Sequence, residues 1–162
     1  SHGESMMTPK LEARIMQELA VKKHENVLEI GAGSGYMAAL LAHKARHVTT
    51  VEIEPELKAL AEKNLADYGV SNVTVELGDG VQGWGDASYD VVVVSGSVPS
   101  VPEALLANVK VGGRLLAIVG TAPAMTAQII TRTSDVAYST VGLFETIVKP
   151  LRNAPAPSQF KF

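Results

Sequence analysis

A glycine-rich segment joins a short apolar strand directly to the start of a helix, and it constrains the fold more than any other part of the sequence. It runs from Asn26 to Tyr36 and reads Asn-Val-Leu-Glu-Ile-Gly-Ala-Gly-Ser-Gly-Tyr. Gly31, Gly33 and Gly35 allow the backbone to turn sharply and to approach a ligand, because they carry no Cβ. The segment favours an α/β fold with a nucleoside cofactor, although such turns also occur as plain connections.

The spacing of the glycines distinguishes two classes of cofactor. A dinucleotide fingerprint, G-x-G-x-x-G, would place its third glycine at position 36, which is Tyr36 here. The observed pattern, Glu-x-Gly-x-Gly-x-Gly, begins at Glu29 and ends at Gly35. It resembles motif I of the class I S-adenosylmethionine (SAM) methyltransferases. The resemblance implies that the loop lies under the methionine part of SAM, whereas Tyr36 disfavours an NAD-binding protein.

Composition limits the class of protein further. Of the 162 residues, 46% are hydrophobic and only 5% aromatic, so aliphatic side chains build the core, as suits a parallel sheet covered on both faces. The net charge of −3 argues against general nucleic-acid binding, which needs a concentrated basic face. No apolar run approaches the ~20 residues of a membrane span, and a signal peptide is not evident. We expect a cytoplasmic protein without nucleic-acid or membrane partners.

Strand and helix signals alternate along the chain, which predicts an α/β class fold with a doubly wound, Rossmann-like sheet. Strands are predicted at 27–30, 47–52, 73–77, 89–94 and 114–119, and helices at 9–20, 36–44, 54–68 and 102–109. Two further strands, at 127–133 and 139–148, are joined by a turn too short for a helix. They predict a C-terminal antiparallel hairpin on a mostly parallel, seven-stranded methyltransferase sheet. Residues 1–152 would form one SAM-dependent methyltransferase domain, and 153–162 a loose tail.

Two acidic residues at predicted strand ends extend the cofactor hypothesis. Glu52 ends the second strand, about 20 residues after the glycine loop, where a carboxylate can meet ribose hydroxyls. Asp79 follows the third strand and can accept a hydrogen bond from an exocyclic amine. The alternatives are a surface glutamate at a strand end and an aspartate that shapes a turn between two glycines.

Several segments together resemble the protein-L-isoaspartate O-methyltransferases. They are 27–36, Val51-Glu52, Gly78-Asp-Gly-Val-Gln-Gly-Trp84, Tyr89-Asp90 and 112–116 with Val119-Gly120, and the run from Gly78 to Trp84 is the most particular to this family. The resemblance implies that the glycine loop holds the methionine moiety, that Glu52 and Ile53 bind the ribose and adenine edge, and that Asp79 and Gly80 bind the adenine amino group. The residues expected around the methionine end are Glu29, Gly31, Ala32, Gly33, Ser34, Gly35 and Ser95.

The resemblance is weakest just before the first helix. The family carries Thr-Ile-Ser-x-Pro there, with a serine regarded as catalytic, and this chain has Ser5-Met-Met-Thr-Pro9. Met7 replaces the serine and cannot donate a hydrogen bond to a carboxylate. Thr8 or Ser5 could substitute if the backbone brings its hydroxyl to the reacting position. Met7, Thr8 and Ser5 are therefore the candidate catalytic residues.

Four functions are candidates on these observations, and Tyr36 disfavours the fourth. The first is SAM-dependent O-methylation of isoaspartyl carboxyl groups in damaged proteins, a protein-repair transferase activity. A carboxylate acceptor is ionised at neutral pH and needs no general base. The second is methylation of a small-molecule acceptor in a less polar pocket, the third a SAM-binding module without turnover, and the fourth an NAD-binding protein. The expected cofactor is SAM, no metal is expected, and the partner is an isoaspartyl-containing peptide or a small-molecule acceptor.

Overall fold

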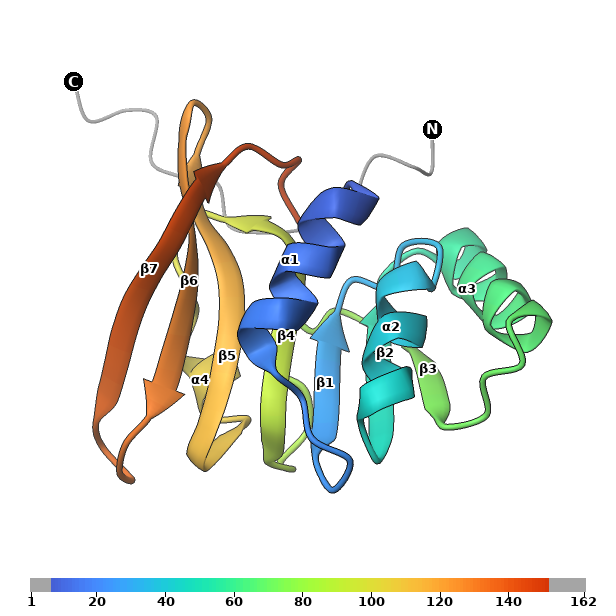
Figure 1. Cartoon of the computed structure of the whole chain (residues 1–162), viewed down its shortest axis with the longest axis horizontal. Helices are drawn as coiled ribbons and strands as arrows, with labels where there is room; N and C mark the ends of the chain where they lie inside the picture. The colour runs from blue at the N-terminus through green and yellow to red at the C-terminus, as the bar shows by residue number, and fades with distance from the viewer. Residues whose placement is uncertain (1–6, 152–162) are drawn as a thin grey trace.

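A seven-stranded sheet with helices packed against it forms the body of the molecule (Figure 1). The computed structural model describes residues 7–151, so the predicted tail at 153–162 and Ser5 lie outside the described residues. The strands are β1 (Asn26–Ile30), β2 (His47–Glu52), β3 (Val73–Leu77), β4 (Tyr89–Val98), β5 (Val109–Thr121), β6 (Ala124–Arg132) and β7 (Tyr138–Thr146). The helices are α1 (Pro9–Leu19), α2 (Tyr36–Lys44), α3 (Pro55–Asp67) and α4 (Glu103–Leu106).

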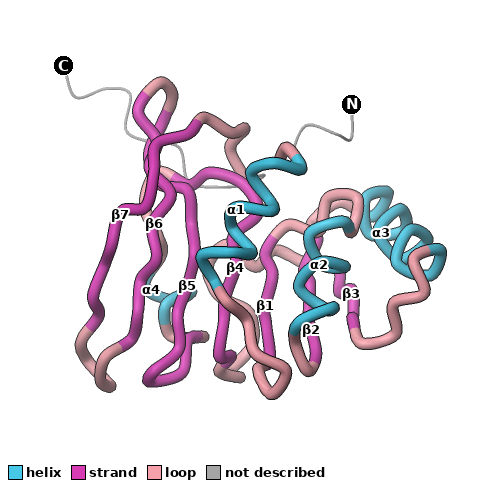
Figure 2. The backbone as a smooth tube through the Cα atoms, in the orientation of Figure 1, coloured by secondary structure: helices cyan, strands magenta, loops and turns pink. Residues whose placement is uncertain are grey.

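The strands follow the order β3-β2-β1-β4-β5-β6-β7 across the sheet (Figure 2). The pairs from β3 to β5 are parallel, whereas β6 runs antiparallel to β5 and β7 antiparallel to β6. Thr121 pairs with Ala124, so a tight turn leads from β5 into β6 without a crossover helix. This topology confirms the predicted Rossmann-like methyltransferase sheet with an antiparallel hairpin at its C-terminal edge.

Alternating residues of the central strands face two different layers. Val27 and Val91 belong to the core under α1 and α2, which lie in front of the sheet in Figure 1. Leu28 and Val92 face the opposite layer, together with Leu105 of α4. Both faces are covered, which explains why these strands read as continuous apolar runs. Within residues 7–151, no helix has the length and apolar character needed to span a bilayer.

The fourth helix is shorter than the predicted 102–109. It ends at Leu106, and Val109 begins β5 opposite Tyr89. The side-chain Oδ1 of Asn108 accepts a hydrogen bond from the Trp84 amide at 2.9 Å, and its backbone carbonyl accepts one from the Tyr89 amide at 2.6 Å. These long-range bonds fix Asn108 between two segments, so tertiary contacts override local helix propensity.

Strands β4 and β5 are both longer than predicted. The predicted glycine turn before β5 is part of the strand, where Gly112 has a φ of 85°. A Cβ on Gly113 would lie 2.7 Å from the carbonyl oxygen of Asp90, so glycine permits this close approach of two backbones. β4 continues to Val98 through a register shift between Val93 and Ser97, an irregularity common near functional sites.

Arg114 of β5 links the sheet to the C-terminal end of α1 by hydrogen bonds. Its Nη2 and Nε donate to the Leu19 carbonyl oxygen at 2.7 and 2.9 Å, which satisfies an acceptor left over at the helix end. Its Nη1 and Nη2 each donate to the Glu25 carboxylate at 3.0 Å. The hydrogen bonds from Arg114 lower the pKa of Glu25 from its usual value.

Replacing Arg114 by methionine should lower the free energy of unfolding by about 2–4 kcal/mol at neutral pH, because hydrogen bonds to charged groups are lost and Glu25 keeps a buried, unpaired charge. The lowered pKa of Glu25 means that its stabilising contribution is present above its unfolded-state pKa and is lost as pH falls through the folded-state pKa. The difference between Arg114→Met and wild type should therefore shrink in acid. Urea denaturation at about pH 7 and about pH 3 measures both effects.

The matched control is Arg46→Met, because the Arg46 side chain is exposed. It should change the free energy of unfolding by less than about 0.5 kcal/mol. Equal losses in the two variants would contradict the role assigned to Arg114.

Candidate functional site

The candidate site lies where β1 and β4 end, at the point where the strand order reverses. β2 and β3 continue the sheet on one side of β1, and β4 and β5 on the other. Connections that leave neighbouring parallel strands in opposite directions open a crevice at their carboxyl ends. Two small hollows lie at this edge, and Gly31 lines both of them.

The glycine loop between β1 and α2 requires glycine for steric reasons. Gly31, Gly33 and Gly35 have φ angles of 93°, 52° and 88°, in the left-handed region that other residues disfavour. A Cβ on Gly35 would lie 3.1 Å from the Ala61 carbonyl oxygen, and one on Gly31 would lie 2.9 Å from Cδ1 of Leu151. The loop therefore combines an unusual backbone path with close contacts on both sides.

Glu52, at the end of β2, holds this loop in place. Its Oε1 accepts hydrogen bonds from the amides of Ala32 and Gly33 at 3.0 and 3.1 Å, and its Oε2 accepts one from the Glu54 amide at 3.0 Å. The side chain is buried and lines the first hollow. The ribose role predicted for Glu52 stays a prediction, and the anchoring of the loop is a function that the motif spacing did not reveal.

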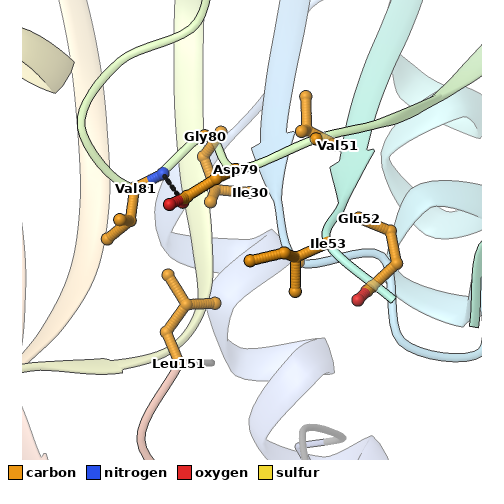
Figure 3. A pocket seen from close by; sticks show the side chains of 10 residues that line it. Ile30, Val51, Glu52, Ile53, Asp79, Gly80, Val81 and Leu151 are labelled. Atoms are coloured by element: carbon orange, nitrogen blue, oxygen red, sulfur yellow. Dashed lines mark hydrogen bonds between the residues drawn. The ribbon is translucent and has the colours of Figure 1, made fainter. Parts of the chain in front are cut away.

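The first hollow has apolar walls and two acidic residues, Glu52 and Asp79 (Figure 3). Its lining contains several of the residues predicted for the adenosine end of SAM, namely Glu52, Ile53, Asp79 and Gly80. Figure 3 shows Leu151 reaching into the hollow from the C-terminal end of the described chain. The full lining is Ile30, Gly31, Val51, Glu52, Ile53, Gly78, Asp79, Gly80, Val81 and Leu151.

Asp79 and Gly80 shape the turn after β3. Oδ1 of Asp79 accepts a hydrogen bond from the Val81 amide at 3.2 Å, which is the turn role that the sequence left open as an alternative. Asp79 also lines the first hollow, so a turn role and a binding role are compatible. A Cβ on Gly80 would lie 2.6 Å from Cδ1 of Ile30, which accounts for the glycine here.

The second hollow contains the glycine loop and two buried carboxyl groups. The sequence predicted most of its members, including Glu29, Ser34, Ser95 and Met7, which is only 4% exposed. The full lining is Met7, Glu12, Glu29, Gly31, Ala32, Gly33, Ser34, Tyr36, Met37 and Ser95. The predicted loop residues from Gly31 to Ser34 thus line the two hollows, whereas Gly35 lines neither and packs against Ala61.

Glu29 is completely buried in β1, which lies between β2 and β4 in the sheet. The hydroxyl groups of Thr50 and Ser95 donate to its two carboxylate oxygens at 2.7 and 2.6 Å. Burial raises the pKa of Glu29 to about 8, although these two hydrogen bonds act in the opposite direction; the nearby Glu12 and Glu52 raise it further. Glu29 therefore holds a proton more firmly than an exposed glutamate does.

Glu12 is the functional candidate that the sequence analysis missed. It lies on the buried face of α1 and is 5% exposed, and burial raises its pKa to about 7. A signal was present, because Glu12 precedes Ile15 by three residues and Leu19 by seven, the spacing of a helical apolar stripe. A charged residue on such a stripe is unusual enough to indicate a role.

The other catalytic candidates lie apart from the second hollow or outside the described residues. The Thr8 side chain caps α1 by accepting a hydrogen bond from the Leu11 amide at 3.2 Å. It lines a separate hollow with Arg14, Phe144 and Thr146. Ser5 precedes the described residues. Of the three candidates, Met7 is the one that the structure brings to the glycine loop.

Leu151 is a second lining residue that no sequence pattern predicted. Its amide donates to the Ser97 carbonyl oxygen at 2.7 Å, and the Ser97 amide donates to Lys149 at 3.1 Å. A Cβ on Gly96 would lie 2.9 Å from the Leu151 Cα, so the glycine leaves space for the returning chain. This segment closes the first hollow only because of long-range pairing with β4.

Comparisons with known proteins place this arrangement in a class and then in a family. The sheet order, with the glycine loop at the switch point, defines a Rossmann-like methyltransferase fold. A solved protein-L-isoaspartate O-methyltransferase superposes with a TM-score of 0.78 at 30% identity, over 88% of this chain and 46% of that one. A SAM-dependent methyltransferase from Thiobacillus denitrificans, in complex with S-adenosyl-L-homocysteine, has a TM-score of 0.60 at 22% identity, over 71% and 49%.

The sequence model of the protein-L-isoaspartate(D-aspartate) O-methyltransferase family matches residues 1–153. The chain belongs to this family, which confirms the resemblance seen in its motifs. It is 40% identical, over 151 residues, to protein-L-isoaspartate O-methyltransferase 2 of Marinobacter nauticus, covering 92% of this chain and 69% of that protein. The chain spans 54% to 57% of the length of other curated relatives with the same activity in their names.

The steric argument for the glycine loop is testable with a pair of alanine variants. Gly35→Ala should lower the free energy of unfolding by about 2–3 kcal/mol, because it combines a left-handed backbone with a close contact to Ala61. Gly69→Ala is the control, since Gly69 has a φ of 73° and nothing within 4 Å of its Cβ position. It should cost only about 1 kcal/mol. Denaturant unfolding that shows equal losses would contradict a steric role for Gly35.

Proposed function

We propose that the chain binds SAM across the two hollows and transfers its methyl group to the carboxylate of isoaspartyl residues in damaged proteins. The observation that carries this proposal is that Gly31, the first glycine of the loop with the predicted SAM spacing, lines both hollows. Family membership and relatives named for this activity support it. A cytoplasmic location and a role in protein repair are part of the same proposal.

The chemistry of the lining suits the two ends of SAM. Ile30, Val51 and Val81 offer apolar surface to a purine ring in the first hollow, with Asp79 beside them. Glu29 in the second hollow suits the charged methionine end. When bound, SAM supplies an electrophilic methyl group on a sulfonium, with a thioether as leaving group. The protein has to align the reactants and exclude water.

An isoaspartyl carboxylate reaches the site already ionised, because its unperturbed pKa lies near 4. The chain therefore needs no general base, and its residues have to orient the acceptor. Met7 borders the second hollow where the family resemblance places a serine, and a thioether donates no hydrogen bond. We infer that Met7 weakens the orientation of the acceptor and leaves the displacement itself possible.

The proposal predicts methylation of an isoaspartyl peptide. The chain, incubated with methyl-labelled SAM, should form a base-labile methyl ester on this peptide and none on the aspartyl peptide of identical sequence. The aspartyl peptide is the matched control, because it differs only in which carboxyl group carries the backbone. Absence of ester above background would overturn the proposed acceptor, and binding of SAM without transfer to any acceptor would favour a SAM-binding module.

Restoring a hydroxyl should improve catalysis. Met7→Ser is expected to raise kcat/KM for the isoaspartyl peptide by about tenfold over Met7→Ala, because one hydrogen bond to a charged group contributes about 1.5 kcal/mol. Met7→Ala is the matched control, since both variants lose the same buried thioether and differ mainly in the hydroxyl. Equal rates for the two variants would show that a hydroxyl at this position does not orient the acceptor.

A small-molecule acceptor is the alternative that one observation favours. Met7 and Met37 both line the second hollow and are 4% and 2% exposed, so part of this surface is apolar and adaptable. A screen of small acceptors with labelled SAM distinguishes the alternatives, because transfer to a small molecule with no transfer to the isoaspartyl peptide would favour this one.

A further inference from the structure

The carboxyl group of Glu12 is buried in the second hollow and has no partner among residues 7–151. The residue is 5% exposed and lines the hollow beside Glu29. In the described part of the chain, no hydrogen-bond donor or cation contacts this carboxyl group, and burial alone accounts for its raised pKa. An ionised carboxylate in such a position is costly unless another charge compensates it.

The other titratable groups around the hollow do not provide that compensation. Glu29 faces it from β1, Tyr36 from the start of α2, and Glu52 lies at the neighbouring end of β2. No lysine, arginine or histidine belongs to the described lining. Ser95 and Thr50 direct their hydroxyl groups to Glu29. The local field of the hollow therefore favours a positively charged ligand.

We propose that Glu12 binds the cationic methionine end of SAM and makes the site selective for SAM over its demethylated product. This inference rests on the proposed function. SAM carries an ammonium, a sulfonium and a carboxylate, and so has one net positive charge. Methyl transfer converts the sulfonium into a neutral thioether, so S-adenosylhomocysteine has no net charge. A carboxylate facing the hollow attracts SAM more strongly than S-adenosylhomocysteine. The loss of this attraction after methyl transfer favours release of the product.

Binding of a cation should also displace protons from the two carboxyl groups. Burial raises the pKa of Glu12 to about 7 and that of Glu29 to about 8. A nearby positive charge lowers both pKa values because it stabilises the ionised forms. SAM should therefore bind more tightly as pH rises from about 6 to about 8, with release of protons to the buffer.

Isothermal titration calorimetry of SAM and S-adenosylhomocysteine, in buffers with different ionisation enthalpies, tests the proposal. Glu12→Gln keeps the shape and removes the charge. At about pH 8 it should weaken SAM binding roughly fivefold to tenfold and S-adenosylhomocysteine binding by less than about twofold. It should also release fewer protons on SAM binding and show a flatter dependence on pH. Glu18→Gln, on the exposed face of the same helix, should match the wild type.

The unliganded protein gives a second measurement. Because the folded-state pKa of Glu12 is raised, the wild type should lose stability relative to Glu12→Gln as pH rises from about 4.5 to about 7. If the wild type and Glu12→Gln prefer SAM over S-adenosylhomocysteine by the same factor, the variant weakens the binding of both ligands equally. That result overturns the role of Glu12, while the proposed function stands. If the wild type does not bind SAM, both proposals fail.

Discussion

Hydroxyl groups of Thr50 and Ser95 donate to the two oxygens of Glu29 and so tie three neighbouring strands together under the glycine loop. Glu29 lies in β1, Thr50 in β2 and Ser95 in β4. A carboxyl group in this position would be costly without both hydroxyl donors, because the side chain is fully buried and an unsatisfied buried polar group destabilises the fold. Glu52 adds a second constraint by binding two amides of the loop. The conformation of the loop therefore depends on side chains of strands far apart in sequence.

Local steric rules explain what the sequence could predict. The glycine loop follows from its spacing, because each glycine has a backbone conformation or a close contact that a side chain would disturb. The buried valines of β4 follow from the covered faces of a parallel sheet. The short α4 and the long β5 could not be predicted, because Asn108 is fixed by hydrogen bonds to segments about 20 residues away.

The residues of the candidate site also differ in how far the sequence predicts them. Glu52 and Asp79 are predicted from their positions at strand ends, which follow from the alternation of strands and helices. Glu12 was missed because its importance comes from the packing of α1 over the glycine loop, and Leu151 because its position depends on pairing with β4. The strand ends carry the family pattern, whereas Met7, two residues before α1, departs from it. Met7 and Glu12 of α1 both line the second hollow, at the methionine end of the proposed cofactor site.

The two ends of the described chain both lie near Gly31. Met7 lines one hollow beside Gly31, and Leu151 lines the other. During translation, Met7 is the first and Leu151 the last of the described residues to leave the ribosome. Because a domain generally folds as a unit, the wall that Leu151 contributes to the first hollow forms only when nearly all of the described chain is available. A chain that ends before Leu151 lacks this part of the enclosure.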